Sequence, residues 1–242
     1  MDYAEIRLSG SGGQGMGLAG RIFSESAIAE GYNVCQTQSY GPEARGGASR
    51  TDIIVSRDKI LFPNCRNLDV LLAMNQESSD KFSCSVREEG LILVDSTYVD
   101  QPPEGNRVYE YQLTKTSLET FKIPLAANLI ALGIIAALTR IFSLESWTDS
   151  IRRTVPKKYR ELNLDAFELG HREGREILHV EEGRVPVAYD RKRPVPECIK
   201  ERFDGRTASG SGKNGGAAKG KRGNGSKKKT KTTKKKGGGK KK

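Results

Sequence analysis

The chain has 242 residues, 36% of them hydrophobic, and a formal net charge of +11. Residues 206–242 contain 15 Lys or Arg residues and no Asp or Glu. The chain has 41 basic residues in all, so residues 1–205 contain 41 − 15 = 26 basic residues and all 30 acidic residues. The first 205 residues therefore carry a net charge of −4, and the basic character of the whole chain says nothing about what a folded part binds.

Hydrophobic periodicity and turn residues predict the elements in chain order. The first part is predicted as a strand at 4–9, a glycine-rich turn, a helix from Leu18 to Ile28 that Gly31 ends, and a second strand at 32–37. Next come a hairpin of 50–56 and 59–62 around Arg57-Asp58, buried strands at 69–74 and 91–95 with a polar helix between them, and a strand at 108–112.

The second half of the chain changes in character. Residues 116–142 form an apolar helical region interrupted at Pro124, and helices are predicted at 144–154 and 157–179. The whole pattern is typical of an α/β fold, a Rossmann-like open sheet of mixed direction with helices on both faces, followed by C-terminal helices. We expect three parts: one domain at 1–180, an extended proline-containing arm at 181–205, and a disordered Lys/Gly-rich tail at 206–242.

No membrane segment or secretory signal is expected. The longest apolar run, residues 125–138, is 14 residues long, too short to span a bilayer. Residues 1–5 are acidic and lack a long apolar core. We therefore expect a cytoplasmic protein that does not enter a membrane.

The glycine-rich turn has the spacing of a dinucleotide-binding loop. Gly10, Gly12 and Gly15 satisfy G-x-G-x-x-G between a predicted strand and a predicted helix, where backbone amides and a helix amino terminus favour an anion. A dinucleotide enzyme also needs an acidic residue at the end of the second strand, and residues 34–38 contain none. This leaves two interpretations: a different phosphate-bearing ligand, or a turn that allows close packing.

A second loop, residues 38–50, follows the second strand and carries Tyr40, Glu43 and Arg45 among its glycines. Ligands bind at this edge of open α/β sheets, and Arg suits phosphate or carboxylate. The functional interpretation is an anion-recognising loop beside the glycine turn. The alternative is a surface loop whose Glu43 and Arg45 pair with each other.

Metal and cluster sites are not expected in this chain. The four cysteines contain no C-x-x-C pair, and only two histidines are present; these residues are Cys35, Cys65, Cys84, Cys198, His171 and His179. Neither an iron–sulfur cluster nor a cysteine-based zinc site is therefore predicted, and the thiols are expected to be reduced.

The apolar helix after Pro124 is expected to be buried nearly all round, in the domain's own core or at a subunit contact. Its apolar residues cover more than one helical face: Leu125, Ala126, Leu129, Ile130, Ile134, Ile135, Ala137 and Leu138. Asn128 is polar among them and should find a hydrogen-bond partner, for which a structural role is the more common one.

Four stretches carry a family resemblance. SGSGGQGMGLAG at 9–20 and QSYGPEARGGASRTDIIVS at 38–56 resemble the gamma subunit of the 2-oxoacid:ferredoxin oxidoreductases, most closely the 2-oxoglutarate branch. PLAANLIALGIIAAL at 124–138 and NLDAFELGHREG at 163–174 resemble the helices that close that domain. The resemblance covers about residues 6–174 and offers no role for the tail.

The resemblance implies that this chain has no catalytic activity on its own. The family decarboxylates a 2-oxoacid oxidatively and forms an acyl-coenzyme A thioester. Its thiamine diphosphate, magnesium and iron–sulfur clusters lie on partner subunits, implying alpha, beta and ferredoxin-like delta partners and ferredoxin as the electron acceptor. This chain would complete the coenzyme A and substrate side of the active site.

The resemblance also implies which residues line that site. Those residues are Gly10, Gly12, Gly13, Gln14, Gly15, Tyr40, Glu43 and Arg45. None of them is expected to be catalytic. The glycine turn would approach ligand through backbone groups, and Arg45 either contacts an anion or pairs with Glu43 to lock the loop against a partner.

Two other classes of function stay open. The chain could be an independent nucleotide-binding α/β protein, or a polyanion-binding protein that acts through its tail. A solvated tail is the favoured interpretation, and nucleic acid is not the expected partner, because no aromatic residues lie between the lysines to stack on bases. A third role for the tail would be to attract an acidic ferredoxin.

Overall fold

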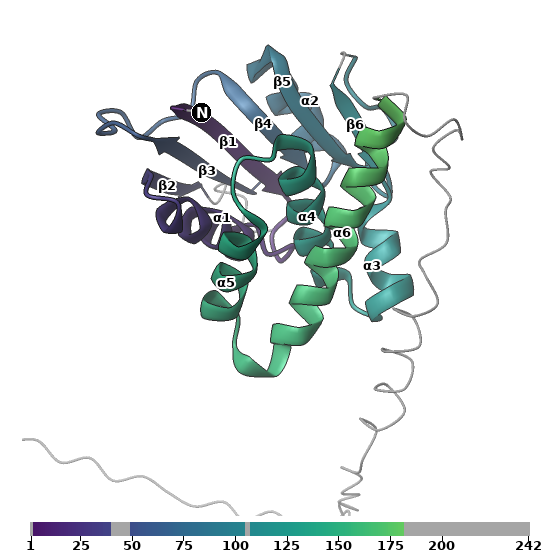
Figure 1. Ribbon diagram of the computed structural model, residues 1–242. Coiled ribbons are helices and arrows are strands. Elements are labelled where there is room, and N and C mark those ends of the chain that lie inside the picture. The colour runs from purple at the N-terminus through teal and green to yellow at the C-terminus, as the bar shows by residue number, and fades with distance from the viewer. Residues whose placement is uncertain (1, 40–48, 105–106, 182–242) are drawn as a thin grey trace, which may run out of the picture.

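A computed structural model describes residues 2–39, 49–104 and 107–181, which form an α/β domain (Figure 1). The predicted tail, and the predicted arm from residue 182 onward, lie outside the described residues. Within the described residues, no helix is both long enough and apolar enough to cross a membrane.

One sheet of six strands forms the centre of the domain, in the order β2-β3-β1-β4-β5-β6. The strands are β1 (Tyr3–Gly10), β2 (Asn33–Ser39), β3 (Ser49–Ser56), β4 (Leu68–Ala73), β5 (Val86–Asp95) and β6 (Val108–Tyr111). β3 runs antiparallel to its two neighbours, β1 and β2, whereas the β1–β4, β4–β5 and β5–β6 pairs are parallel. The predicted mixed sheet is confirmed.

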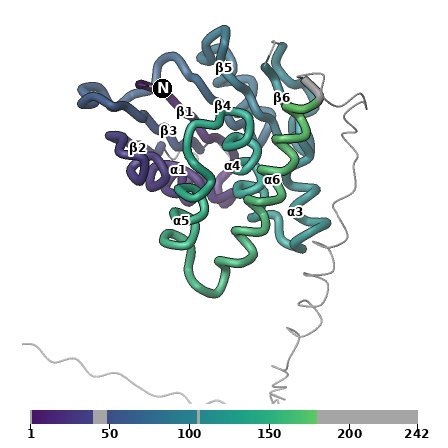
Figure 2. Tube along the Cα trace, in the orientation of Figure 1, coloured from purple at the N-terminus to yellow at the C-terminus, as the bar shows by residue number. Residues whose placement is uncertain are grey.

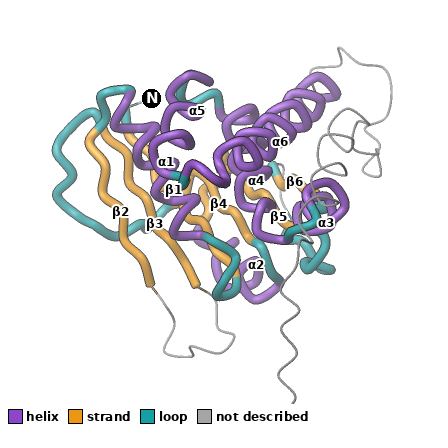
Figure 3. The backbone as a smooth tube through the Cα atoms, turned by 90° about the horizontal axis from the view of Figure 1, so that it is seen from below, coloured by secondary structure: helices purple, strands orange, loops and turns teal. Residues whose placement is uncertain are grey.

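Helices cover the two faces of this sheet unequally (Figure 3). The helices are α1 (Met16–Ala29), α2 (Gln76–Phe82), α3 (Leu113–Phe121), α4 (Ala127–Thr139), α5 (Leu144–Thr154) and α6 (Arg160–Glu181). α1, α4, α5 and α6 lie on one side of the sheet and the short α2 lies on the other. Helices on both faces were predicted correctly, but the coverage of the second face is much thinner.

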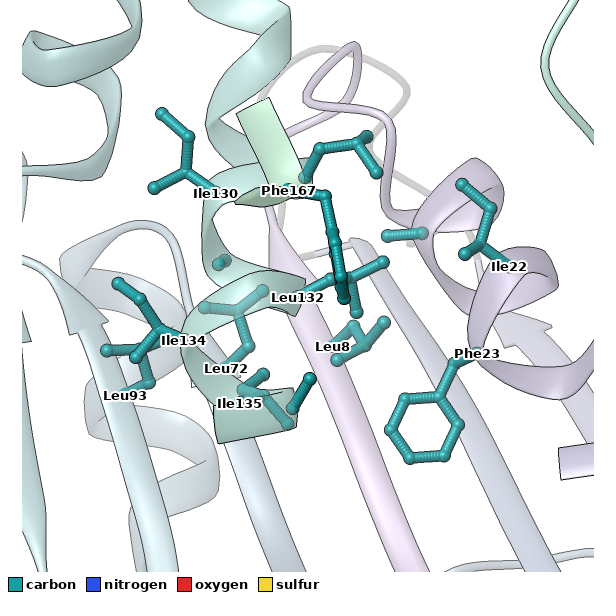
Figure 4. Packing of buried hydrophobic residues seen from close by; sticks show 14 of the residues in the cluster. Leu8, Ile22, Phe23, Leu72, Leu93, Ile130, Leu132, Ile134, Ile135 and Phe167 are labelled. Atoms are coloured by element: carbon teal, nitrogen blue, oxygen red, sulfur yellow. The ribbon is translucent and has the colours of Figure 1, made fainter. Parts of the chain in front are cut away.

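The main core lies between the sheet and the large helical layer (Figure 4). Leu8, Leu72 and Leu93 project from three neighbouring strands toward Ile134 and Ile135 of α4. All five side chains are fully buried. Burying a large apolar side chain contributes about 1.5–3 kcal/mol, so this layer stabilises the domain and fixes α4 over the strands.

α4 and α6 run side by side above the sheet (Figure 2). Glycines face the partner backbone at this crossing: a β-carbon on Gly133 would meet the Phe167 carbonyl oxygen, and one on Gly170 would meet the Ile130 carbonyl oxygen. The backbones can approach this closely only because neither position carries a side chain. α4 is therefore held between the sheet and α6, as expected for a helix whose residues 127–138 are all buried.

Two details of the sequence prediction are wrong. Residues 59–62 form no strand, because both sides of β3 are already paired and the chain leaves the sheet at Arg57, whose amide donates to the Asp2 carbonyl oxygen at 2.8 Å. Leu125 is not buried in the apolar helix. It is 46% exposed because it lies in a 3-10 turn, Pro124–Ala126, before α4 begins.

The second face of the sheet carries a buried ion pair between β1 and β3. The Arg7 guanidinium donates to both carboxylate oxygens of Asp52, at 2.6 and 2.7 Å. Its carbon atom lies 4.7 Å from the centre of the Phe82 ring at the end of α2. Arg50 shares the same carboxylate more weakly, at 3.7 Å. Charged groups thus replace apolar packing where α2 ends.

Candidate functional site

The glycine turn joins β1 to α1 at the carboxyl edge of the parallel strands. Gly13 and Gly15 have φ angles of +91° and +77°, a region that non-glycine residues rarely adopt. Gly15 is also the residue that caps the amino terminus of α1, and it does so without any side-chain hydrogen bond. Among the described residues, the first amides of the helix therefore have no side-chain cap, an arrangement that favours a negatively charged group.

The glycines of the turn serve two different purposes. A β-carbon on Gly10 would collide with the Gln14 side chain and with Met74, and one on Gly15 would collide with Asn128. A β-carbon on Gly12 or Gly13 would have no heavy atom within 4 Å. Gly10 and Gly15 thus permit close packing, whereas the tip of the turn is open.

Three side chains hold the turn in place: one belongs to the turn itself, and two come from neighbouring elements. The Gln14 side chain folds back and accepts a hydrogen bond from the Ser11 amide at 2.6 Å. Asn75, which caps α2, donates to the Ser11 hydroxyl at 2.7 Å. Asn128 of α4 donates to the carbonyl oxygens of Gln14 and Gly15, at 3.3 and 3.2 Å. The predicted hydrogen bond of Asn128 is confirmed, and its partner is the candidate site itself.

A pocket of about 130 Å³ opens beside the turn. Its lining consists of Gly13, Gln14, Met74, Tyr98, Thr114, Pro124 and Leu125. The glycine backbone forms one polar wall and the Met74, Pro124 and Leu125 side chains an apolar one. Tyr98 and Thr114 were not predicted as site residues, because the turn after β5 and the first turn of α3 come close to the glycine turn only through the order of the strands in the sheet.

The buried carboxylate of Asp95 holds together two segments at this edge of the sheet. The carboxylate is fully buried and accepts hydrogen bonds from the Thr97 amide at 3.1 Å and from the Thr114 hydroxyl at 2.5 Å. The Thr114 amide donates to it as well, at 3.1 Å. Asp95 thereby links the end of β5 to the start of α3 and fixes the wall of the pocket.

The second predicted loop begins and ends next to the glycine turn. Ser49 pairs with Gly10, and Ser39 pairs with Arg50, so the described residues on either side of 40–48 lie beside the end of β1. The predicted site residues Tyr40, Glu43 and Arg45 themselves lie outside the described residues. The predicted proximity of the two loops is confirmed for the residues that flank them.

The position of a dinucleotide-binding carboxylate is occupied by an amide. Gln38, near the end of β2, lies against α1, where a β-carbon on Gly17 would approach its side-chain nitrogen to 2.6 Å. No carboxylate is present in β2. This part of the site therefore differs from that of a dinucleotide enzyme, as the sequence indicated.

Other candidate groups lie away from the turn. A pocket of about 240 Å³, lined in part by Arg87, Glu88 and Arg107, lies where β5 and β6 begin, at the opposite edge of the sheet. Burial, and then the charges of Asp52 and Glu5, raise the pKa of the Cys65 thiol to about 12, so it is not a nucleophile at neutral pH. Among the described residues, no group of three or more His, Cys, Asp or Glu could hold a metal.

Comparison with known proteins agrees with the sequence resemblance. The family model of pyruvate ferredoxin/flavodoxin oxidoreductase matches residues 5–173. The chain is 41% identical to the 2-oxoglutarate synthase subunit KorC of Methanocaldococcus jannaschii over 72% of this chain and 95% of that one. It is 42% identical to KorC of Archaeoglobus fulgidus over 71% and 88% of the two chains.

A solved structure resembles the described domain. The gamma subunit of a keto/oxoacid ferredoxin oxidoreductase from Geobacter sulfurreducens superposes with a TM-score of 0.64 and 40% identity, over 70% of this chain and 95% of that one. The matched region ends before the basic tail, since the family model stops at residue 173.

Proposed function

Because the chain belongs to the pyruvate ferredoxin/flavodoxin oxidoreductase family and is a gamma subunit of a 2-oxoacid:ferredoxin oxidoreductase, we propose that it completes the coenzyme A and substrate side of a thiamine diphosphate active site. The 2-oxoacid is 2-oxoglutarate, in keeping with the names of the two KorC relatives. The product is the corresponding acyl-coenzyme A.

The open tip of the glycine turn is the observation that carries this proposal. Among the described residues, the amides of Gly12 and Gly13 have no hydrogen-bond acceptor, and the adjoining helix α1 starts without a side-chain cap. Such amides bind phosphate or carboxylate oxygens without any charged side chain. Coenzyme A carries phosphates and 2-oxoglutarate carries carboxylates, so either can supply the anion.

Partner subunits supply the reactive groups in this proposal. Thiamine diphosphate with magnesium, and the iron–sulfur cluster, lie on alpha, beta and delta subunits, and ferredoxin accepts the electrons. Thiamine diphosphate, when bound, provides the carbanion chemistry of decarboxylation. This chain orients the anionic ligand, and Arg45 adds a positive charge from the loop at 40–48.

An apolar rim beside the turn suits contact with such a partner. We define it as Tyr98 and Leu125, which are 51% and 46% exposed. Tyr98 and Leu125 also line the 130 Å³ pocket next to Gly13. A partner that covers this rim would exclude water from the ligand at the turn.

Gly12→Ala tests the proposal directly. Gly12 does not have a positive φ, and its β-carbon would meet no atom of the described chain, so the variant should keep the melting temperature of the assembled complex. The methyl group would instead meet the ligand. We expect the KM for coenzyme A or for 2-oxoglutarate to rise roughly tenfold, equivalent to a loss of about 1.4 kcal/mol of binding energy.

Gly31→Ala is the matched control for this experiment. Gly31 has a φ of +79° at the far end of α1, so the same substitution should lower the melting temperature and leave both KM values unchanged. Unaltered KM values for both ligands in the Gly12→Ala complex would contradict the proposed role of the turn.

A further inference from the structure

Asn128 is an isolated polar residue in an apolar helix. It is the one polar side chain between Ala127 and Leu138 of α4, and it is fully buried. Its amide nitrogen donates to two carbonyl oxygens, those of Gln14 and Gly15, across 114 and 113 residues of chain. The amide therefore acts on the backbone of the glycine turn and on no other described group.

The bonding of Asn128 is incomplete, which is unusual for a purely structural residue. Its side-chain oxygen is buried and has no partner among the described residues. Leaving a buried acceptor unpaired costs about 1–3 kcal/mol, which offsets the gain from the two donated bonds. An apolar residue of the same size would avoid this cost in a helix that is otherwise apolar. The benefit of the amide must then lie in what it does to the turn.

The turn needs an external constraint because glycine does not fix its own backbone. Gly13 and Gly15 have positive φ angles, and glycine adopts positive and negative φ almost equally well. Rotation of one peptide plane at the turn would replace an outward amide by a carbonyl oxygen, which repels an anion. Hydrogen bonds that hold the Gln14 and Gly15 carbonyls inward select against that rotation.

We propose that Asn128 is the positioning residue of the glycine turn, holding the Gln14 and Gly15 carbonyls inward so that the Gly15 and Met16 amides, which lie in the same two peptide planes, stay directed toward an anionic ligand at the turn. This inference rests on the proposed ligand site at the turn. It makes α4, which the sheet and α6 fix in place, part of the site although Asn128 does not touch the ligand.

The experiment uses Asn128→Leu, which removes both donors and keeps the size of the side chain. The first readout is hydrogen–deuterium exchange of residues 10–18 in the free full-length chain, which we expect to become faster. The second is calorimetric titration of the assembled complex with coenzyme A and, separately, 2-oxoglutarate. We expect the Kd of one of them to rise roughly tenfold, with kcat at saturating substrate changed less than twofold.

Two further variants make the test specific. Asn128→Ser retains one donor and should give intermediate exchange and affinity, and it also serves if the leucine variant folds poorly. Thr139→Val is the matched control, because it removes a polar group from the opposite end of α4, where the hydroxyl bonds only to the Ile135 carbonyl oxygen. It should change neither readout.

The outcomes separate this inference from the proposed function. Unchanged exchange at residues 10–18 in Asn128→Leu overturns the inference, whatever the ligand is. Faster exchange with unaltered affinity for both ligands also overturns it, because the turn conformation would then not matter for binding. If Gly12→Ala leaves both KM values unaltered, the proposed ligand site itself fails, and that result does not depend on Asn128.

Discussion

Gly170→Ala is expected to destabilise the folded domain by about 3 kcal/mol, at the upper end of the usual cost of overpacking. The added β-carbon would collide with the carbonyl oxygen of Ile130 and lie 2.7 Å from its carbonyl carbon. These are backbone atoms of α4, so no side-chain rotation can relieve the contact. Alanine should improve helix propensity by about 1 kcal/mol, but the steric term is larger. The measurement is the free energy of unfolding from urea titration.

Gly17→Ala provides the comparison for Gly170→Ala. Gly17 is also a helical glycine, in α1, but its β-carbon would meet the end of the flexible Gln38 side chain, which can move. The variant should be neutral or slightly more stable. Equal stabilities for the two alanine variants would show that the α4–α6 crossing adjusts without cost, and the packing argument for α4 would be wrong.

The sequence predicts the elements of this fold well where a signal is local. The helix at 144–154 has the bounds of α5, because Ser143 caps it through the Ser146 amide and Pro156 follows its end. The break at Pro124 is also confirmed, since proline cannot donate the hydrogen bond that a continuous helix needs. Each of these features depends only on residues near it in the chain.

Long-range contacts limit what the sequence can predict. Residues 59–62 have strand-like composition, but β3, the strand with which they were predicted to pair, already pairs with β1 and β2 on its two sides. The glycine turn is located correctly from its spacing, whereas two of the three side chains that hold it come from the residue that caps α2 and from α4. Asn75 lies 64 residues from Ser11, and Asn128 lies 113 residues from Gly15. No local pattern relates these residues to the turn.

The buried ion pair on the second face of the sheet leads to the other large expected effect. Asp52→Asn should destabilise the domain by about 3–5 kcal/mol, because it leaves the Arg7 charge buried without its counter-charge. It also leaves Arg7 and Arg50 facing each other next to the Phe82 ring, whose centre is 4.7 and 5.7 Å from the two guanidinium carbons. The free energy of unfolding from urea titration of the variant and of the unsubstituted domain measures this loss.

The double variant Arg7→Met with Asp52→Leu should recover most of the lost stability, because apolar packing against Phe82 replaces two desolvated charges. Asp149→Asn is the exposed control: Asp149 pairs with Arg152 at 3.0 Å on the surface of α5, and its loss should cost less than about 1 kcal/mol. The two pairs have similar contact distances, so burial accounts for the expected difference. A small loss in Asp52→Asn, similar to that in the control, would mean that water reaches Arg7 and that this face of the sheet is more open than its burial indicates.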